Sequence, residues 1–166
     1  NNKKIVIFSI EEELNPGINA LLKSLKEQEI SVKIISGDSM VSVSRIAQKI
    51  GFNTDDIIDL SQNHFETESE LAKFVERKTI FTRAKLEDKI KIVRILKSKG
   101  HKVAMVGDGI NDVLGLKASD VSISMESGAK ITREISDIVL MENDYKKIPT
   151  IFFEGENILF NLKIST

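Results

Sequence analysis

Short apolar runs rich in β-branched residues alternate with longer amphipathic stretches along almost all of this 166-residue sequence. Ile5–Ile10 and Val32–Ile35 are two such runs, and each is followed by a stretch whose apolar residues recur at spacings of three and four. This alternation is typical of βα units, in which each amphipathic helix covers one face of a parallel sheet. The sequence therefore predicts a three-layer α/β/α, Rossmann-like fold with a mainly parallel sheet.

The same pattern predicts the remaining elements and a single domain over residues 1–144. We expect a helix opened by Pro16-Gly17 and another that ends at Gly51. The further helices are expected at 70–76, at 86–99 and from about 111, and the further strands at 57–60, 79–81, 102–106, 121–124 and 138–141. Residues 144–166 are expected to form one long C-terminal helix of about 22 residues.

Composition excludes several classes of function. The 24 basic and 25 acidic residues are interspersed and give a net charge of −1, so nucleic acid is not expected as a partner. The absence of cysteine excludes thiol nucleophiles, zinc-thiolate sites and iron–sulfur clusters. No apolar run approaches the roughly 18 residues of a membrane helix, so we expect no membrane span within this sequence.

The segment from Val103 to Asp112 carries the sharpest chemical signal. A buried strand delivers Asp108 to its carboxyl end, where open α/β sheets bind their ligands. Asp112 follows one helical turn later and can point into the same crevice, so the two carboxylates suit a Mg²⁺ that also binds phosphate. The structural alternative is an Asp-Gly turn followed by Asn111 as a helix cap.

Three weaker signals lie elsewhere in the sequence. Ser36-Gly37-Asp38 follows a strand and precedes a helix, so its hydroxyl and backbone amides could hold an anion, or it could simply cap the helix. Lys89 and Arg83 could contact a phosphoryl group, or could be ordinary solvated cations. In a parallel sheet these places come to the carboxyl ends of strands that can be neighbours, so the ordered set predicts a phosphate site.

The ordered set resembles the haloacid dehalogenase superfamily and, within it, the phosphorylation domain of P-type cation-transporting ATPases. Residues 80–89, IFTRAKLEDK, look like the family's Phe-Ala-Arg-x-x-Pro-x-x-Lys segment, and residues 104–120, AMVGDGINDVLGLKASD, look like its hinge motif nearly residue for residue. The resemblance continues through residues 121–140 and reaches residues 154–163, which look like the stalk that leads into a membrane helix.

By this resemblance, the chain would take part in ATP-driven cation transport. Ser36 and Gly37 would hold the phosphoryl group, and Asp38 would lie near the nucleotide phosphates. Arg83 and Lys89 would contact ATP or the phosphoryl group. Mg²⁺ would be the cofactor, bound by Asp108 and Asp112, with Asn111 completing the site; Lys89, Asp108 and Asp112 would be the catalytic residues.

The resemblance also implies a setting for the whole protein. The transported cation would bind elsewhere, in membrane helices absent from this sequence, and this domain would lie on the cytoplasmic side of the cell membrane. The family's phosphorylated aspartate lies in an Asp-Lys-Thr-Gly-Thr motif, which this sequence lacks. We therefore expect a fragment that holds the C-terminal part of the phosphorylation domain, residues 1–144, with residues 145–166 as the stalk helix. Such a fragment would be inactive alone.

Two alternatives stay open at this point. A stand-alone phosphatase of the same superfamily would use the first strand for its nucleophile, but Ser9 and Glu11 stand where two aspartates are expected. An inactive phosphate-binding module would keep the fold without turnover. A further departure is Glu12-Glu13-Leu14-Asn15, which replaces the family's Asp-Pro-x-Arg and so removes an arginine that would contact the nucleotide.

Overall fold

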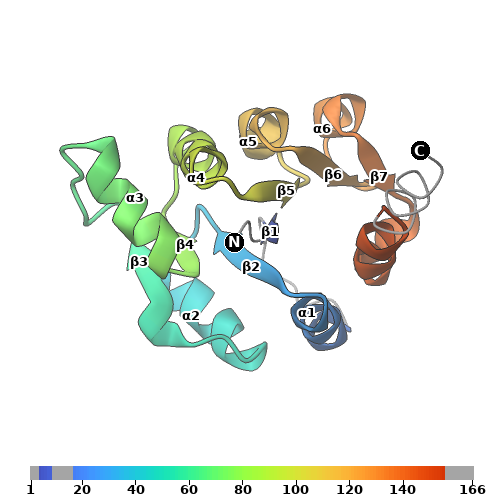
Figure 1. The fold of residues 1–166 in the computed structure, drawn as a ribbon, viewed down its shortest axis with the longest axis horizontal. Helices are drawn as coiled ribbons and strands as arrows, with labels where there is room; N and C mark the ends of the chain where they lie inside the picture. The colour runs from blue at the N-terminus through green and yellow to red at the C-terminus, as the bar shows by residue number, and fades with distance from the viewer. Residues whose placement is uncertain (1–3, 9–16, 156–166) are drawn as a thin grey trace, which may run out of the picture.

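The computed structural model describes residues 4–8 and 17–155, and within them it contains a seven-stranded parallel sheet. The strand order is β3-β4-β2-β1-β5-β6-β7, which places β1 near the centre (Figure 1). The strands are β1 (Lys4–Phe8), β2 (Ile30–Ile35), β3 (Ile57–Asp59), β4 (Ile80–Thr82), β5 (Lys102–Val106), β6 (Val121–Met125) and β7 (Ile138–Leu140).

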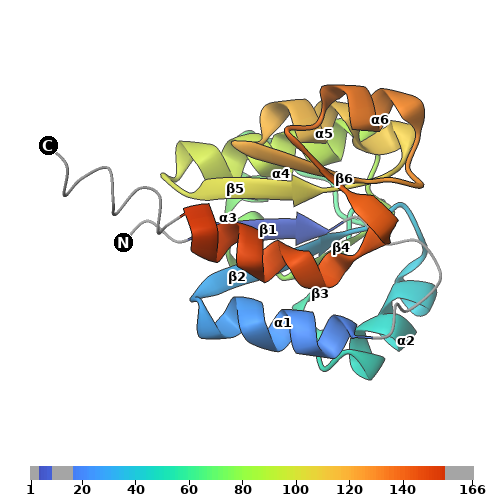
Figure 2. The same cartoon turned by 90° about the vertical axis from the view of Figure 1, so that its right-hand side faces the viewer.

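Helices cover both faces of this sheet, as Figure 2 shows edge-on. One layer holds α3 (Glu68–Arg77), α4 (Leu86–Ser98), α5 (Val113–Ala118) and α6 (Lys130–Ile135). The other layer holds α1 (Ile18–Glu27), α2 (Met40–Lys49) and the helical residues 148–155. The predicted three-layer α/β/α class with a parallel sheet is thus confirmed.

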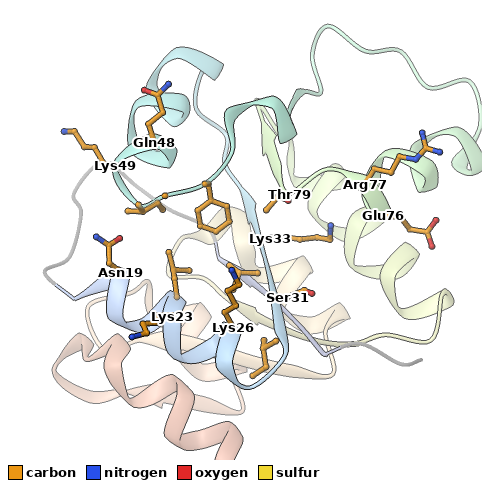
Figure 3. A pocket seen from close by; sticks show the side chains of 16 residues that line it. Asn19, Lys23, Lys26, Ser31, Lys33, Gln48, Lys49, Glu76, Arg77 and Thr79 are labelled. Carbon is orange, nitrogen blue, oxygen red and sulfur yellow. The ribbon is translucent and has the colours of Figure 1, made fainter.

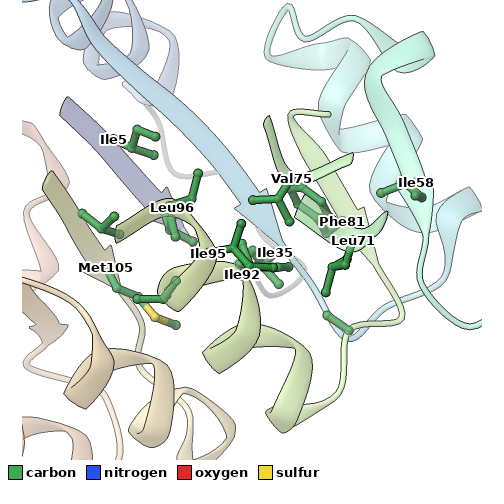
Figure 4. Close-up of a cluster of buried hydrophobic side chains, with 14 of the residues drawn as sticks. Ile5, Ile35, Ile58, Leu71, Val75, Phe81, Ile92, Ile95, Leu96 and Met105 are labelled. Atoms are coloured by element: carbon green, nitrogen blue, oxygen red, sulfur yellow. The ribbon is translucent and has the colours of Figure 1, made fainter. Parts of the chain in front are cut away.

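Successive side chains of the central strands point to opposite faces of the sheet, so the core consists of separate clusters on its two faces. On β1, Ile5 and Ile7 face the cluster formed with α3, α4 and α5, whereas Val6 faces α1. Figure 4 shows the first cluster, in which Ile92 and Leu96 of α4 lie over the sheet. Because both faces of a parallel sheet are covered, its strands are mainly apolar, which made them visible in the sequence.

Two helices differ from expectation. The helix α6 was not predicted, because it is only six residues long and one of its few apolar side chains, Ile131, is 41% exposed. The helix α3 begins at Glu68 rather than near residue 70, because the Thr67 hydroxyl accepts a hydrogen bond from the Glu70 amide and so caps it. The side chain of Thr67 therefore determines the first residue of α3.

The C-terminal segment is not one continuous α-helix from Asp144. The backbone of Asp144 is non-helical, Tyr145–Lys147 is a 3₁₀ turn, and the α-helix begins at residue 148. Pro149 explains this start, because proline lacks an amide hydrogen and fits only the first turn of a helix. Residues 156–166 lie outside the described residues, so the length of this helix and its role as a stalk stay predictions.

No helix in the described ranges is long and apolar enough to span a membrane. The first strand is described over Lys4–Phe8, and the last two residues of the predicted strand, 9 and 10, lie outside the described residues. Ser9 and Glu11, which the phosphatase alternative needs, lie outside the described residues, and so does the segment 12–15.

A carboxylate joins β6 to the loop before β7. Asp137 accepts hydrogen bonds from the amide and hydroxyl of Ser122, at 2.8 and 2.6 Å, and these bonds lower the pKa of Asp137. An acid whose pKa is lowered by folding contributes stability above its unfolded pKa and loses it as pH falls through the folded value. We expect Asp137→Ala to reduce the free energy of unfolding by about 1 kcal/mol at pH 7.

This difference between variant and wild type should shrink as pH falls from the ordinary carboxyl range through the lowered pKa of Asp137. Urea unfolding at pH 7 and pH 3 measures it, with the exposed Glu134→Ala on α6 as a control expected to change little. A difference that stays constant with pH would contradict the assignment to Asp137.

Candidate functional site

Most of the predicted site residues gather at the carboxyl end of β1, where the sheet changes its direction of winding. The chain runs from β1 to β2 on one side and, after β4, crosses to β5 on the other side of β1. The loops after β2 and β5 therefore diverge around the end of β1, which is where open α/β sheets bind ligands. β2 and β5 are not direct neighbours, because β1 separates them.

The loop after β2 is held by Ser36. Its side chain is 2% exposed, and its hydroxyl donates to the Asp38 carboxylate at 3.0 Å and accepts from the Asp38 amide at 3.1 Å. Gly37 and Asp38 themselves are exposed. The interpretation of this triplet as a helix cap is wrong, because Ser39 is the residue that caps α2.

Lys89 of α4 lies inside the protein and forms a buried ion pair. Its ammonium lies 2.5 Å from Oδ1 of Asp112, and the two side chains are 5% and 3% exposed. The other carboxylate oxygen of Asp112 accepts a hydrogen bond from the Gly109 amide at 3.1 Å. The interpretation of Lys89 as an ordinary surface cation is therefore wrong, and the pair ties α4 to the loop after β5.

Asp108 lies between two glycines of the same loop and is half-buried. Burial raises the pKa of Asp108, and the nearby negative charge of Asp112 raises it further, whereas Lys89 lowers it. The carbonyl oxygen of Asp108 accepts bonds from the Ala129 amide at 2.8 Å and the Thr132 hydroxyl at 3.3 Å. Its backbone is thus fixed while its charge stays incompletely compensated.

Sequence reasoning missed the residues that hold this backbone. A Cβ atom at Gly128 would lie 3.1 Å from the Asp108 carbonyl oxygen, so glycine permits the close approach of the two loops. Thr132 is fully buried and belongs to the unpredicted helix α6. The one signal available was the Ser127-Gly128 dipeptide, which followed a strand but carried no chemistry of its own.

A cavity of about 320 Å³ lies between the two loops. Six of the predicted residues line it together with Lys85 and Gly109, namely Ser36, Gly37, Asp38, Lys89, Asn111 and Asp112. The predicted convergence of the two loops and α4 is present. Asn111 is exposed within the 3₁₀ turn Ile110–Asp112, and it is not the cap of α5.

Arg83 does not line this cavity. Its side chain lies beside Asp59, with Nε 3.5 Å from the carboxylate, and it lines a neighbouring cavity of about 610 Å³. Only its backbone meets the loop after β2, through a 2.9 Å hydrogen bond from the Arg83 amide to the Asp38 carbonyl. Any contact of Arg83 with a ligand must therefore be made from the adjoining cavity.

The donor set fits Mg²⁺ better than a metal held wholly by protein. Within the described ranges no three or more His, Cys, Asp or Glu side chains come together as a metal site. Mg²⁺ binds through one or two carboxylates and takes its other ligands from phosphate and water. Asp108 does not itself line the cavity, but it is half-buried and immediately precedes Gly109, which does, so its carboxylate is the candidate ligand.

A larger cavity, of about 770 Å³, lies at the opposite edge of the sheet (Figure 3). Lys26, Lys49 and Arg77 line it, and each lies in the last turn of its helix, where a cation complements the negative end of the helix dipole. None of the predicted site residues lines this cavity, so its size does not make it the candidate site.

Gly107 leaves the space that the Asp112 side chain occupies. A Cβ atom at position 107 would lie 2.7 Å from Cβ and 2.8 Å from Cγ of Asp112. We expect Gly107→Ala to displace Asp112 from Lys89 and to reduce the free energy of unfolding by roughly 1–3 kcal/mol. Gly155→Ala is the matched control, because a Cβ there meets nothing within 4 Å. Equal stability of the two variants in urea unfolding would contradict this steric account.

Known proteins are similar to this chain in sequence. The chain is 39% identical over 159 residues to a probable cation-transporting ATPase, exp7, of Streptococcus pneumoniae, and 36% identical over 154 residues to the calcium-transporting ATPase CtpE of Mycolicibacterium smegmatis. These alignments cover 95% and 93% of this chain but only 20% and 19% of the relatives. The chain thus spans about a fifth of their length.

A solved structure has the same fold. It is the catalytic domain of the CPx-ATPase CopB-B, with a TM-score of 0.66 and 26% identity, and the match covers 85% of this chain and 46% of that one. The resemblance to P-type cation-transporting ATPases is confirmed by these similarities. Residues 2–120 match the haloacid dehalogenase-like hydrolase family, so the chain belongs to that family.

Proposed function

We propose that this chain is part of the phosphorylation domain of a P-type ATPase that moves a cation across a membrane. The observation that carries the proposal is the convergence of Ser36, Lys89, Asn111 and Asp112 on one cavity, which is also lined by Gly109, the residue that follows Asp108. Similarity to cation-transporting ATPases over 95% of the chain supports the same function. ATP is the proposed substrate and Mg²⁺ the proposed cofactor.

Each side chain has a role that its geometry suits. The Gly37 amide can donate to phosphoryl oxygens, the Ser36 hydroxyl can do so when it turns away from Asp38, and Lys89 can neutralise their charge. Asp112 already binds Lys89 and the Gly109 amide, so we assign it mainly to positioning that lysine, with metal ligation secondary. Asp108 is the proposed Mg²⁺ ligand; a bound Mg²⁺ would neutralise charge on the transferred phosphoryl group.

In this proposal the chain supplies the residues that bind the phosphoryl group and Mg²⁺, but not the residue that is phosphorylated. The phosphorylated aspartate of the Asp-Lys-Thr-Gly-Thr motif is absent from these 166 residues, so the nucleophile must come from another part of the protein. In the whole protein we place this domain on the cytoplasmic side of the cell membrane and the transported cation in membrane segments outside this chain. Residues 145–166 would connect the two.

Phosphorylation of the full-length protein tests the metal assignment. With radiolabelled ATP and Mg²⁺, the wild type should form an acid-stable phosphoprotein, and Asp108→Asn should lose nearly all of it, because the neutral amide binds Mg²⁺ far more weakly. Asp55→Asn makes the same chemical change on the exposed surface far along the chain and should label normally. Full labelling of Asp108→Asn would overturn the role of Asp108.

The isolated chain separates this proposal from the phosphatase alternative. We expect the 166-residue protein to release no phosphate from ATP or an aryl phosphate with Mg²⁺, because it lacks the nucleophile. Phosphate release that Lys89→Met abolishes would instead favour a free-standing phosphatase. A chain that binds phosphate tightly without any larger parent protein in the source cells would favour a binding module.

A further inference from the structure

Asp59 ends the edge strand β3 and is a buried carboxylate outside the phosphoryl cavity. It is 4% exposed, and its Oδ1 accepts hydrogen bonds from the amide and hydroxyl of Ser61, at 2.9 and 2.7 Å. Oδ2 lies 3.5 Å from Nε of Arg83. The Ser61 hydroxyl, the Ser61 amide and the Arg83 charge together keep the pKa of Asp59 below its ordinary value, so the carboxylate is charged at neutral pH.

Arg83 is fixed at both its backbone and its side chain. Its φ angle of 50° is in the left-handed region, which is uncommon for a residue other than glycine. Its amide donates to the Asp38 carbonyl at 2.9 Å, so the backbone is attached to the loop after β2. Asp59 contacts the guanidinium through Nε, while half of the Arg83 side chain remains exposed.

The exposed part of Arg83 faces a cavity that adjoins the phosphoryl site. Lys85 lines both cavities, so they share a wall. The second cavity is also lined by Lys91 and Arg94, and its acidic lining residues include Asp88, whose carboxylate accepts from the Lys85 amide. A ligand with phosphate in the first cavity and further anionic or hydroxyl groups would reach Arg83 next.

We propose that Asp59 is a positioning residue, which holds the Arg83 guanidinium where it contacts the part of ATP that extends beyond the phosphoryl cavity. This inference rests on the proposed function, because it takes ATP as the ligand. Asp59 orients Arg83 and does not touch the nucleotide itself. The competing account is that the pair only fastens β3 to β4.

A double-mutant cycle on the 166-residue protein distinguishes these accounts. Dissociation constants for ATP and for inorganic phosphate, each with Mg²⁺, are measured by NMR titration for Asp59→Asn, Arg83→Gln and the double variant. We expect Asp59→Asn to weaken ATP binding about fivefold and the double variant to bind no more weakly than Arg83→Gln alone, because Asp59 acts only through that arginine. Phosphate binding should change less than about twofold in all three.

One control variant and one replacement variant accompany the double-mutant cycle. Asp55→Asn removes a carboxylate from the exposed turn just before β3 and should leave ATP binding unchanged. If Asp59→Asn does not fold, Arg83→Lys replaces it, because lysine keeps the charge but lacks the Nε–H that faces Asp59, and it should lose ATP affinity as Arg83→Gln does.

The outcomes separate this inference from the proposed function. Wild-type ATP binding that Asp59→Asn or Arg83→Lys leaves unchanged would overturn the positioning role alone. Additive losses in the double variant would also overturn it, since they would mean that Asp59 acts independently of Arg83. A wild type that binds neither ATP nor phosphate would overturn this inference, while the proposed function would be judged separately by phosphorylation of the full-length protein.

Discussion

The buried ion pair between Lys89 and Asp112 holds the candidate site together. Removing two charges from water is costly, and breaking such a pair by deleting one partner typically costs about 3–5 kcal/mol, because the other charge is left uncompensated. The pair is possible only because Gly107 leaves room for the Asp112 side chain and the Gly109 amide satisfies its second oxygen. One helix and one loop are thereby fixed relative to each other, and the phosphoryl cavity lies between them and the Ser36 loop.

Asp108 contrasts with this ion pair, because the charge of its carboxyl group is only partly compensated by its neighbours. Its backbone is fixed by Ala129 and Thr132, yet its carboxyl group is half-buried next to the charge of Asp112. Burial and the charge of Asp112 make the charged form less favourable than in water, a bound cation would favour it, and a fixed backbone means that little reorganisation is needed for binding. The packing that fixes the backbone of this loop therefore also creates the partly uncompensated charge on which the proposed Mg²⁺ binding depends.

Much of the fold could be predicted because each strand is covered on both faces. The strands at 102–106 and 121–125 were visible as apolar runs, and the helix 86–98 was visible as a period of three and four. The helix α6 and the break before residue 148 were missed, because they depend on a few local contacts and on one proline. Arg83 was expected with the phosphate residues, but its side chain turns toward Asp59, which no local pattern indicated.

The sequence alone determined the class of fold and the order of the motifs, because periodicity and residue identity are properties of the chain itself. Tertiary structure decided which of those residues meet. Ser36 and Asp112 are far apart in the sequence and line one cavity only because β2 and β5 flank β1 in the sheet. Burial of Lys89 and the pairing of Asp59 with Arg83 likewise arise from packing between elements, which no local spacing encodes.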